Sequence, residues 1–304
     1  MNLYLKYRPN ELEQLLGNQS VTAALADMTA DPASCPHSFL LTGPKGCGKT
    51  TVARILAGRL GVSDQDIQEL DTADFRGIDS VREIRRQSQY QPLKGDRRMW
   101  ILDECHRLTN DAQSALLKIL EDTPSHVYFV LCTTDPHKLL PTVRDRCTTF
   151  EMRPLTDVAM KKLLLRVTKS EGQTLTKTVM RQIIQDSLGH PRAALQILDQ
   201  VLRVPEDKRL RTARQSAEEQ NESIELCRAL LKKAPWKEVA RLLRGLKDQD
   251  PESIRRHVLG YAQAVLLNKN DFQSALILEE FIEPFYNSGF PGLVYACYSV
   301  TQNQ

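Results

Sequence analysis

Ser38-Phe39-Leu40-Leu41-Thr42, followed directly by Gly43-Pro44-Lys45-Gly46-Cys47-Gly48-Lys49-Thr50, is the stretch that decides the fold. The first five residues predict a buried strand, and the next eight match the phosphate-binding pattern G-x-x-x-x-G-K-[ST]. Such glycines let backbone N–H groups converge on phosphate oxygens at the positive end of the following helix. We expect Lys49 to reach the β- and γ-phosphates of ATP and the Thr50 hydroxyl to hold Mg²⁺. Taken alone, the pattern could also be a glycine-rich turn that happens to contain a lysine.

A second motif, Met99-Trp100-Ile101-Leu102-Asp103-Glu104, is an apolar strand that ends in two adjacent carboxylates. Like charges side by side are unfavourable unless something neutralises them. Beside a phosphate loop they have separate tasks: Asp103 would hold Mg²⁺ through its water shell, and Glu104 would polarise the water that attacks the γ-phosphate. The alternative is a coincidental pair of surface acids. Together the two motifs predict an intact hydrolytic site.

A third candidate follows the next apolar run, Val127 to Cys132, and reads Thr133-Thr134-Asp135. A polar residue just beyond a strand that neighbours the acidic strand can hold the attacking water and sense the γ-phosphate. Without that context, threonines at such a place are more often a helix cap or part of a turn.

The first half of the chain alternates short apolar runs with helical patterns, which is typical of a parallel α/β sheet. Two helix starts are marked, by a capping box at Ser80-Val81-Arg82-Glu83 and by Thr109-Asn110 before a helix that runs to Glu121. Crossover helices between the strands would make a doubly wound sheet. Five strands are expected, at Ser38 to Thr42, Ile67 to Asp71, Met99 to Asp103, Val127 to Cys132 and Cys147 to Glu151.

After about Arg153-Pro154 the strand pattern stops and only helices are expected. The polar, charged stretch from Val204 to Asn221 predicts a linker or a loosely packed connection, and five helical stretches follow it. We therefore expect three domains, residues 1–153, 154–204 and 205–304. The helices of the small middle domain are predicted at Thr156 to Glu171, Thr176 to Leu188 and Pro191 to Leu202.

The composition is that of an ordinary globular protein, with 304 residues, 41% hydrophobic and 26% charged. A net charge of only +3 means that any DNA-binding surface must come from local clusters of Arg and Lys. No apolar run of about 18 residues predicts a membrane span, and the first residues do not resemble a secretory signal. The seven cysteines are scattered without C-x-x-C spacing, so we expect free thiols in a reducing cytoplasm.

The motifs now support a family resemblance. The order and spacing of the quoted segments, from Lys6-Tyr7-Arg8-Pro9 to about Leu202, resemble the bacterial clamp-loader γ/τ subunit. Arg76-Gly77-Ile78-Asp79 looks more like the small subunits of replication factor C. Besides the phosphate loop, the segments that carry the resemblance are Asp103-Glu104-Cys105-His106, Leu116 to Pro124, Thr133 to Leu139 and Arg146-Cys147.

The resemblance implies an AAA+ architecture: a P-loop α/β domain with a five-stranded parallel sheet, a small helical lid and an all-α C-terminal collar that mediates oligomerisation. It implies that this chain joins other clamp-loader subunits in a pentameric or similar open ring. Such a ring binds ATP and Mg²⁺, opens a sliding clamp, loads it on primer–template DNA and hydrolyses ATP. Following the bacterial likeness, the expected location is the cytoplasm of a bacterium or of a phage-infected host.

Matching the motifs residue by residue adds roles to the site. Thr134 takes the sensor 1 position, and Arg146 takes the place of the arginine finger that reaches a neighbour's γ-phosphate. Arg192, in Gly189-His190-Pro191-Arg192, takes the sensor 2 position on its own subunit's ATP. The expected nucleotide-binding set is Tyr7, Arg8 and Pro9 at the adenine, Gly43, Pro44, Lys45, Gly46, Cys47, Gly48, Lys49, Thr50 and Thr51 at the phosphates, and Arg192.

Three departures from the γ/τ pattern stand out. The family's serine before the finger arginine is Asp145 here, and a carboxylate at that place would orient the guanidinium or weaken its action. The stretch from Thr51 to Asp71 contains no cysteine, so we expect no zinc module. The sequence ends at Gln304, so we expect no τ tail, which is compatible with a compact phage or archaeal-type subunit.

Four arginines are the candidates for DNA contact, and all lie at the start or on the outer face of the helix expected near Ser80. Phosphate contacts need this kind of local positive surface, although a solvated helix face is an equally plain explanation. The resemblance favours Arg76, since the family has a basic residue there that couples DNA to the catalytic glutamate. The four are Arg76, Arg82, Arg85 and Arg86.

Two rival functions stay open at this point. One is another AAA+ DNA-processing ATPase, such as a helicase loader or a branch-migration motor. The other is a structural loader subunit that contributes only Arg146 to its neighbour. Intact Lys49, Thr50, Asp103 and Glu104 speak against the structural subunit, because an inert subunit needs none of them.

Overall fold

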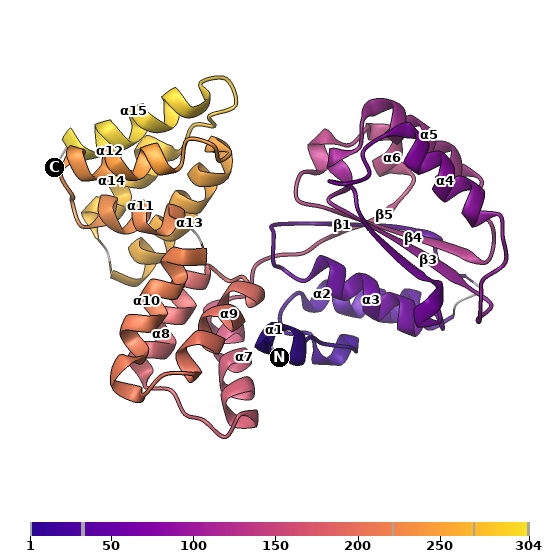
Figure 1. The fold of residues 1–304 in the computed structure, drawn as a ribbon, viewed down its shortest axis with the longest axis horizontal. Coiled ribbons are helices and arrows are strands. Elements are labelled where there is room, and N and C mark those ends of the chain that lie inside the picture. The colour runs from indigo at the N-terminus through magenta and orange to yellow at the C-terminus, as the bar shows by residue number, and fades with distance from the viewer. Residues whose placement is uncertain (1, 32–33, 221, 270, 303–304) are drawn as a thin grey trace. The chain divides into compact units, whose positions relative to one another are not determined.

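The computed structural model describes residues 2–31, 34–220, 222–269 and 271–302 (Figure 1). Contacts divide the chain into two compact units. The first contains Leu3–Ala159 together with His190–Arg192, and the second contains Met160–Gly189 and the chain from Ala193 onward. No helix among the described residues is both long enough and apolar enough to cross a membrane.

The first unit is built on one five-stranded sheet in the order β2-β3-β4-β1-β5. Every neighbouring pair is parallel. The five strands predicted from the sequence are confirmed to within one residue at each end. They are β1 (Ser38–Thr42), β2 (Ile67–Asp71), β3 (Arg98–Asp103), β4 (Val127–Thr133) and β5 (Thr148–Glu151).

Both faces of this sheet are buried, which explains why its strands are continuous apolar runs rather than alternating ones. Met99 and Ile101 of β3 pack on one face in a cluster with Leu56 of helix α3 (Lys49–Arg59). Trp100 and Leu102 pack on the other face. Figure 1 shows α2 (Gln19–Met28) and α3 beside the first face, and α4 (Ile78–Ser88), α5 (Asn110–Glu121) and α6 (Pro141–Asp145) beside the second.

One helix start was predicted correctly and one was not. Thr109 caps α5, because its side chain accepts a hydrogen bond from the backbone N–H of Ala112. The capping box at Ser80 is wrong: α4 begins at Ile78 after Gly77, whose backbone is extended, so Ser80 lies inside the first turn. Short segments complete the unit: α1 (Leu3–Lys6) and 3₁₀ turns at Leu12–Gln14, Asp64–Asp66, Cys105–Arg107 and Pro136–Lys138.

The second unit is helical, as the sequence predicts. The three helices expected after Pro154 are α7 (Asp157–Ser170), α8 (Lys177–Ser187) and α9 (Pro191–Leu202), although α7 begins within the first unit. Thr176 caps α8 by accepting from Val179 N–H. Further along lie α11 (Glu222–Leu231), α12 (Trp236–Gly245), α13 (Pro251–Lys269), α14 (Phe272–Phe281) and α15 (Gly289–Gln302).

The linker expected from Val204 to Asn221 is wrong. The segment forms a 3₁₀ turn (Glu206–Lys208) and helix α10 (Arg209–Gln220), while Asn221 lies outside the described residues. Among the side chains of this segment that the structure describes, the buried ones are the small ones of Ala213 and Ser216, which carry almost no hydrophobic signal. Arg209 adds a specific anchor, because its Nη1 donates to the Thr174 carbonyl at 2.8 Å.

A buried charge network holds three helices of the second unit together. Asp186 of α8 accepts from Arg228 of α11 at 2.7 Å and from the Tyr261 hydroxyl of α13 at 3.3 Å. The Asp186 side chain is fully buried and that of Arg228 is 12% exposed. Burial raises the pKa of Asp186, and the Arg228 charge opposes that rise. Removing one partner of this pair would therefore destabilise the protein mainly because the other charge would stay buried without a counter-charge.

Candidate nucleotide-hydrolysis site

The predicted catalytic groups converge because parallel strands end at one edge of a sheet. The phosphate loop follows β1, the acidic pair ends β3, and Thr133-Thr134 end β4, and these three strands are neighbours in the sheet. Gly43 has a φ of +132°, and a Cβ placed there would lie 2.1 Å from the Met152 carbonyl oxygen. Only glycine therefore fits at the point where the loop leaves the strand.

Lys49 begins α3 and is buried under the loop, where its Nζ donates to the carbonyls of Gly43 at 2.8 Å and Pro44 at 3.0 Å. Gly46 and Gly48 have φ values of +81° and +95°, which give the loop its tight path. An ammonium group, a glycine-shaped loop and a helix N-terminus at one place suit a triphosphate.

Thr50, in the first turn of α3, meets Asp103, at the end of β3. The Thr50 Oγ1 donates to Asp103 Oδ2 at 2.8 Å, and Asp103 Oδ1 accepts from the Glu104 backbone N–H at 3.0 Å. A hydroxyl beside a carboxylate is a pair of hard oxygen ligands of the type that Mg²⁺ takes. These two side chains are the ones that could hold the metal.

Glu104 is held in the left-handed region, with φ 51° and ψ 37°, which is uncommon for a residue with a side chain. Its Oε2 accepts from the Thr134 hydroxyl at 3.1 Å. The structure thus distinguishes the two threonines, because Thr133 is fully buried and its Oγ1 accepts instead from the Asp135 N–H. Thr134 is the one whose hydroxyl meets the carboxylate.

Sequence reasoning missed His106, although it quoted the residue. Its Nδ1 lies 3.0 Å from Thr133 Oγ1 and 3.4 Å from Glu104 Oε2. Burial lowers the pKa of His106, and the neighbouring Glu104 charge does not overcome that effect. The contact with Glu104 is therefore that of a neutral imidazole near neutral pH rather than an ion pair. Only tertiary folding brings Thr133 to His106, so no local pattern in the sequence could reveal this contact.

The N-terminal segment also reaches the site. The Arg8 Nε donates to Thr51 Oγ1 at 3.0 Å, and burial lowers the pKa of Arg8, with Arg54 and Arg192 adding to the effect. Tyr7 and Pro9 on either side are half-buried. The Arg192 guanidinium lies over the Tyr4 ring, 5.1 Å from its centroid.

Residues 190–192 adjoin the phosphate loop. A Cβ placed at Gly46 would lie 3.6 Å from the His190 Cβ and 3.7 Å from the Arg192 Cβ. His190 Nδ1 contacts the Cys47 thiol at 3.4 Å. Burial raises the pKa of Cys47 to about 11, so this thiol is protonated and unreactive near neutral pH. The exposed Lys45 and Pro44 form the outer part of the loop.

Arg146 is not part of this convergence. It ends α6 and precedes β5, so it lies at the opposite edge of the sheet from the phosphate loop. Its side chain is 53% exposed, and Nη2 pairs with Glu121 at 2.9 Å. Asp145 beside it is exposed, and the partner that holds the guanidinium is Glu121 rather than Asp145.

The four arginines proposed for DNA are all exposed. Two of them have their charge offset, because Arg82 pairs with Asp79 at 3.0 Å and Arg86 pairs with Glu83 at 2.8 Å. The Arg76 Nε–H donates to the Ala73 carbonyl at 3.0 Å, and this neutral acceptor does not offset the positive charge of Arg76. Arg76 and Arg85 are therefore the stronger candidates for phosphate contact.

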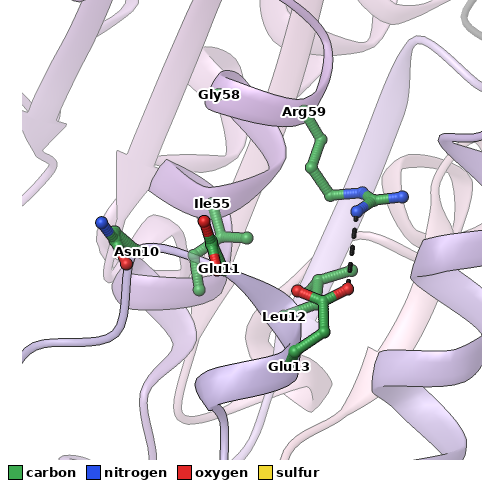
Figure 2. A pocket seen from close by; sticks show the side chains of 7 residues that line it. All are labelled: Asn10, Glu11, Leu12, Glu13, Ile55, Gly58 and Arg59. Carbon is green, nitrogen blue, oxygen red and sulfur yellow. Dashed lines mark ion pairs between the residues drawn. The ribbon is translucent and has the colours of Figure 1, made fainter.

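A surface pocket of about 450 Å³ lies elsewhere on the first unit (Figure 2). It is lined by Asn10–Glu13 and by Ile55, Gly58 and Arg59 from the end of α3. Glu13 and Arg59 face each other across it at 3.9 Å. No predicted site residue lines this pocket, and its carboxylates would repel a phosphate.

Comparison with known proteins finds similar subunits of DNA polymerase III. A family model described as "DNA polymerase III, delta subunit" matches residues 63–156. The DNA polymerase III subunit gamma/tau of Mycobacterium tuberculosis is 37% identical over 225 residues, which cover 66% of this chain and 39% of that protein. The subunit tau of Bacillus subtilis is 30% identical over 221 residues, with 66% and 39% covered. Two thirds of this chain is homologous to gamma/tau.

The chain also matches solved structures. The RuvB Holliday junction branch migration motor of Thermotoga maritima superposes with a TM-score of 0.59, at 20% identity, over 77% of this chain and 84% of the motor. At that identity the match establishes the fold alone: the chain has the fold of P-loop AAA+ ATPases. It spans about two fifths of the length of the gamma/tau relatives quoted above.

Proposed function

We propose that this chain is an ATP-hydrolysing subunit of a clamp loader, which opens a sliding clamp and loads it on primer–template DNA during replication. One observation carries the proposal. A complete hydrolytic set, Thr50 on Asp103 and Thr134 on Glu104, meets at one sheet edge in a chain that is up to 37% identical to gamma/tau subunits.

The roles follow from the contacts. ATP with Mg²⁺ supplies the phosphoryl group and the charge that offsets it. The Lys49 ammonium exchanges the carbonyls of Gly43 and Pro44 for phosphate oxygens. Thr50 and Asp103 hold the metal. Glu104 polarises the attacking water, and Thr134, whose hydroxyl meets its carboxylate, positions the same water.

We further propose that Arg146 acts on nucleotide held by an adjacent subunit. Thr148 is level with Phe39 in the β1–β5 pairing, so Arg146 lies level with His37, six residues before Gly43. At about 3.3 Å per residue, Arg146 is about 20 Å from its own phosphate loop. A guanidinium at that distance cannot touch its own γ-phosphate, but it is exposed and can exchange Glu121 for the γ-phosphate of another subunit.

Other residues complete the proposed subunit. Arg192, beside Gly46, acts on the chain's own ATP, and Tyr7, Arg8 and Pro9 contact the adenine. Arg76 and its neighbouring arginines contact DNA phosphates. Residues 154–204 serve as a lid and residues 205–304 as a collar, in the pentameric or similar open ring that the clamp-loader resemblance implies.

The alternative is a different AAA+ DNA-processing ATPase, such as a helicase loader or a branch-migration motor, and the shared fold alone does not distinguish it from a clamp loader. Steady-state ATP hydrolysis, measured with and without a cognate clamp and primed DNA, separates the two. A loader gains rate only when both are present, whereas a branch-migration motor responds to junction DNA without a clamp. Mass measurement of the assembly gives the number of subunits. No gain from clamp plus primed DNA would refute the clamp-loader proposal.

A further inference from the structure

Thr72 is the residue that follows β2, and it is 2% exposed. The β2–β3 pairing sets Asp71 opposite Asp103, so Thr72 lies opposite Glu104. No sequence motif includes Thr72, and the roles proposed above leave it unused. Its position nevertheless puts a side-chain hydroxyl against the backbone that carries the proposed water-activating carboxylate.

The contacts of Thr72 all go to that backbone. Its N–H donates to the Asp103 carbonyl at 3.0 Å. Its hydroxyl lies 3.0 Å from the same carbonyl and 2.7 Å from the Glu104 carbonyl. The shorter contact makes the Glu104 carbonyl the main acceptor of the single hydroxyl proton. Thr72 therefore binds the peptide on both sides of the Glu104 Cα.

The Glu104 backbone needs such support because a left-handed conformation is disfavoured for a residue with a side chain and persists only where the surroundings hold it. Two other groups take part: Arg107 N–H donates to the Glu104 carbonyl at 2.9 Å, and Asp103 Oδ1 accepts the Glu104 N–H. Of these three groups, Thr72 is the one that lies at the end of a neighbouring strand, so its bond ties the backbone of the turn to β2. The direction of the Glu104 side chain toward Thr134 depends on that turn.

We infer that Thr72 is a positioning residue for ATP hydrolysis. Its hydroxyl holds Glu104 in the left-handed turn so that the Glu104 carboxylate meets Thr134. This inference rests on the proposed role of Glu104. It assigns Thr72 no contact with nucleotide or metal. Loss of the hydroxyl should therefore slow the chemical step and leave nucleotide binding unchanged.

The test compares Thr72→Val, which keeps the shape and removes the hydroxyl, with Thr72→Ser, which keeps the hydroxyl. Thr168→Val is the matched control, since Thr168 is 3% exposed and also donates its hydroxyl to a backbone carbonyl, at 2.8 Å in the second unit. Thr72→Val should lower the turnover rate about tenfold, the effect of one lost buried hydrogen bond, with the ATP dissociation constant within about twofold of wild type. Thr72→Ser and Thr168→Val should stay near the wild-type rate.

A second measurement does not depend on activity. Amide hydrogen exchange in a peptide spanning residues 100–108 should speed up in Thr72→Val and not in Thr168→Val, because the turn loses its anchor. Should Thr72→Val fail to fold, Thr72→Ala and Thr72→Ser carry the comparison. Equal turnover in the variant without the hydroxyl and in Thr72→Ser, or unchanged exchange in the former, would overturn the inference. A wild-type chain that hydrolyses no ATP would instead refute the proposed function, and the exchange measurement would still test the anchor.

Discussion

Removing the Arg146 guanidinium is the sharpest test of whether a neighbouring subunit completes the ATP-hydrolysis site. Within its own chain, Arg146 lies about 20 Å from the phosphate loop, and two unit charges at that distance in a water-like medium interact by about 0.2 kcal/mol. That energy changes a rate by less than about twofold. Acting directly on the transferring phosphoryl group of a neighbour, an arginine finger is worth roughly 10³ to 10⁵ in rate. The two geometries therefore predict effects of Arg146→Ala that differ by orders of magnitude.

The assay mixes two inactive variants. Arg146→Ala keeps Glu104, and Glu104→Gln keeps Arg146. An interface therefore contains both groups when the Arg146→Ala chain binds the ATP and the neighbouring Glu104→Gln chain supplies Arg146. In an assembly of adjacent copies with head-to-tail interfaces, random mixing of equal amounts makes about a quarter of the sites complete. Steady-state ATP hydrolysis of the mixture should approach about a quarter of the wild-type rate, while each variant alone stays near zero.

Two results would refute this reasoning. One is full activity of Arg146→Ala alone, which would show that the arginine is not needed. The other is a mixture as inactive as its components after subunit exchange has been verified by mass measurement. A control with Lys118→Ala, which removes an exposed cation from α5 and leaves Arg146 and Glu121 in place, should behave as wild type in every mixture.

Three further changes test other features. Arg76→Ala should keep basal ATP hydrolysis and lose stimulation by primer–template DNA, because Arg76 is exposed and outside the phosphate site; unchanged stimulation would contradict its role. Arg228→Met should lower the free energy of unfolding by about 3–5 kcal/mol in urea titrations, since it leaves the Asp186 carboxylate buried without its partner. Replacing Asp186 by Leu in the same chain should restore most of that loss, and a double variant no more stable than Arg228→Met would argue against the explanation. His106→Gln should reduce the fall in the free energy of unfolding at acid pH. Burial depresses the folded pKa of His106 below 6.5, so the stabilisation from the neutral imidazole is present above pH 6.5 and is lost as the pH falls through the folded pKa. Parallel acid profiles for the variant and wild type, from denaturation at each pH, would contradict that assignment.

The sheet could be predicted because its strands are buried on both faces. All seven positions of β4 are buried, so the chain must be continuously apolar there, and the run is visible without any structure. The phosphate loop and the acidic pair are equally visible, since each is a contiguous motif. Prediction was weaker wherever the signal is spread over small or polar side chains, as in α10, where Ala213 and Ser216 are buried and arginines cover the outside.

The missed residues share a different cause. His106 meets Thr133 only after β3 and β4 pair, and Thr72 meets Glu104 only after β2 and β3 pair. The spacing of these residues along the chain does not predict either contact. The start of α4 was missed for a local reason: Ser80 fits a capping pattern, but the N-cap is Gly77, whose backbone is extended, so the helix begins three residues earlier.

The close approach of Gly43 to the Met152 carbonyl has a practical consequence for protein engineering. Any side chain at position 43 would collide with the peptide leaving β5, so a mutant library that includes this position would contain mostly misfolded members. Pro44 and Lys45 are exposed, so side chains at these positions can vary without such a collision. A library aimed at the phosphate loop should therefore keep Gly43 and begin at those two positions.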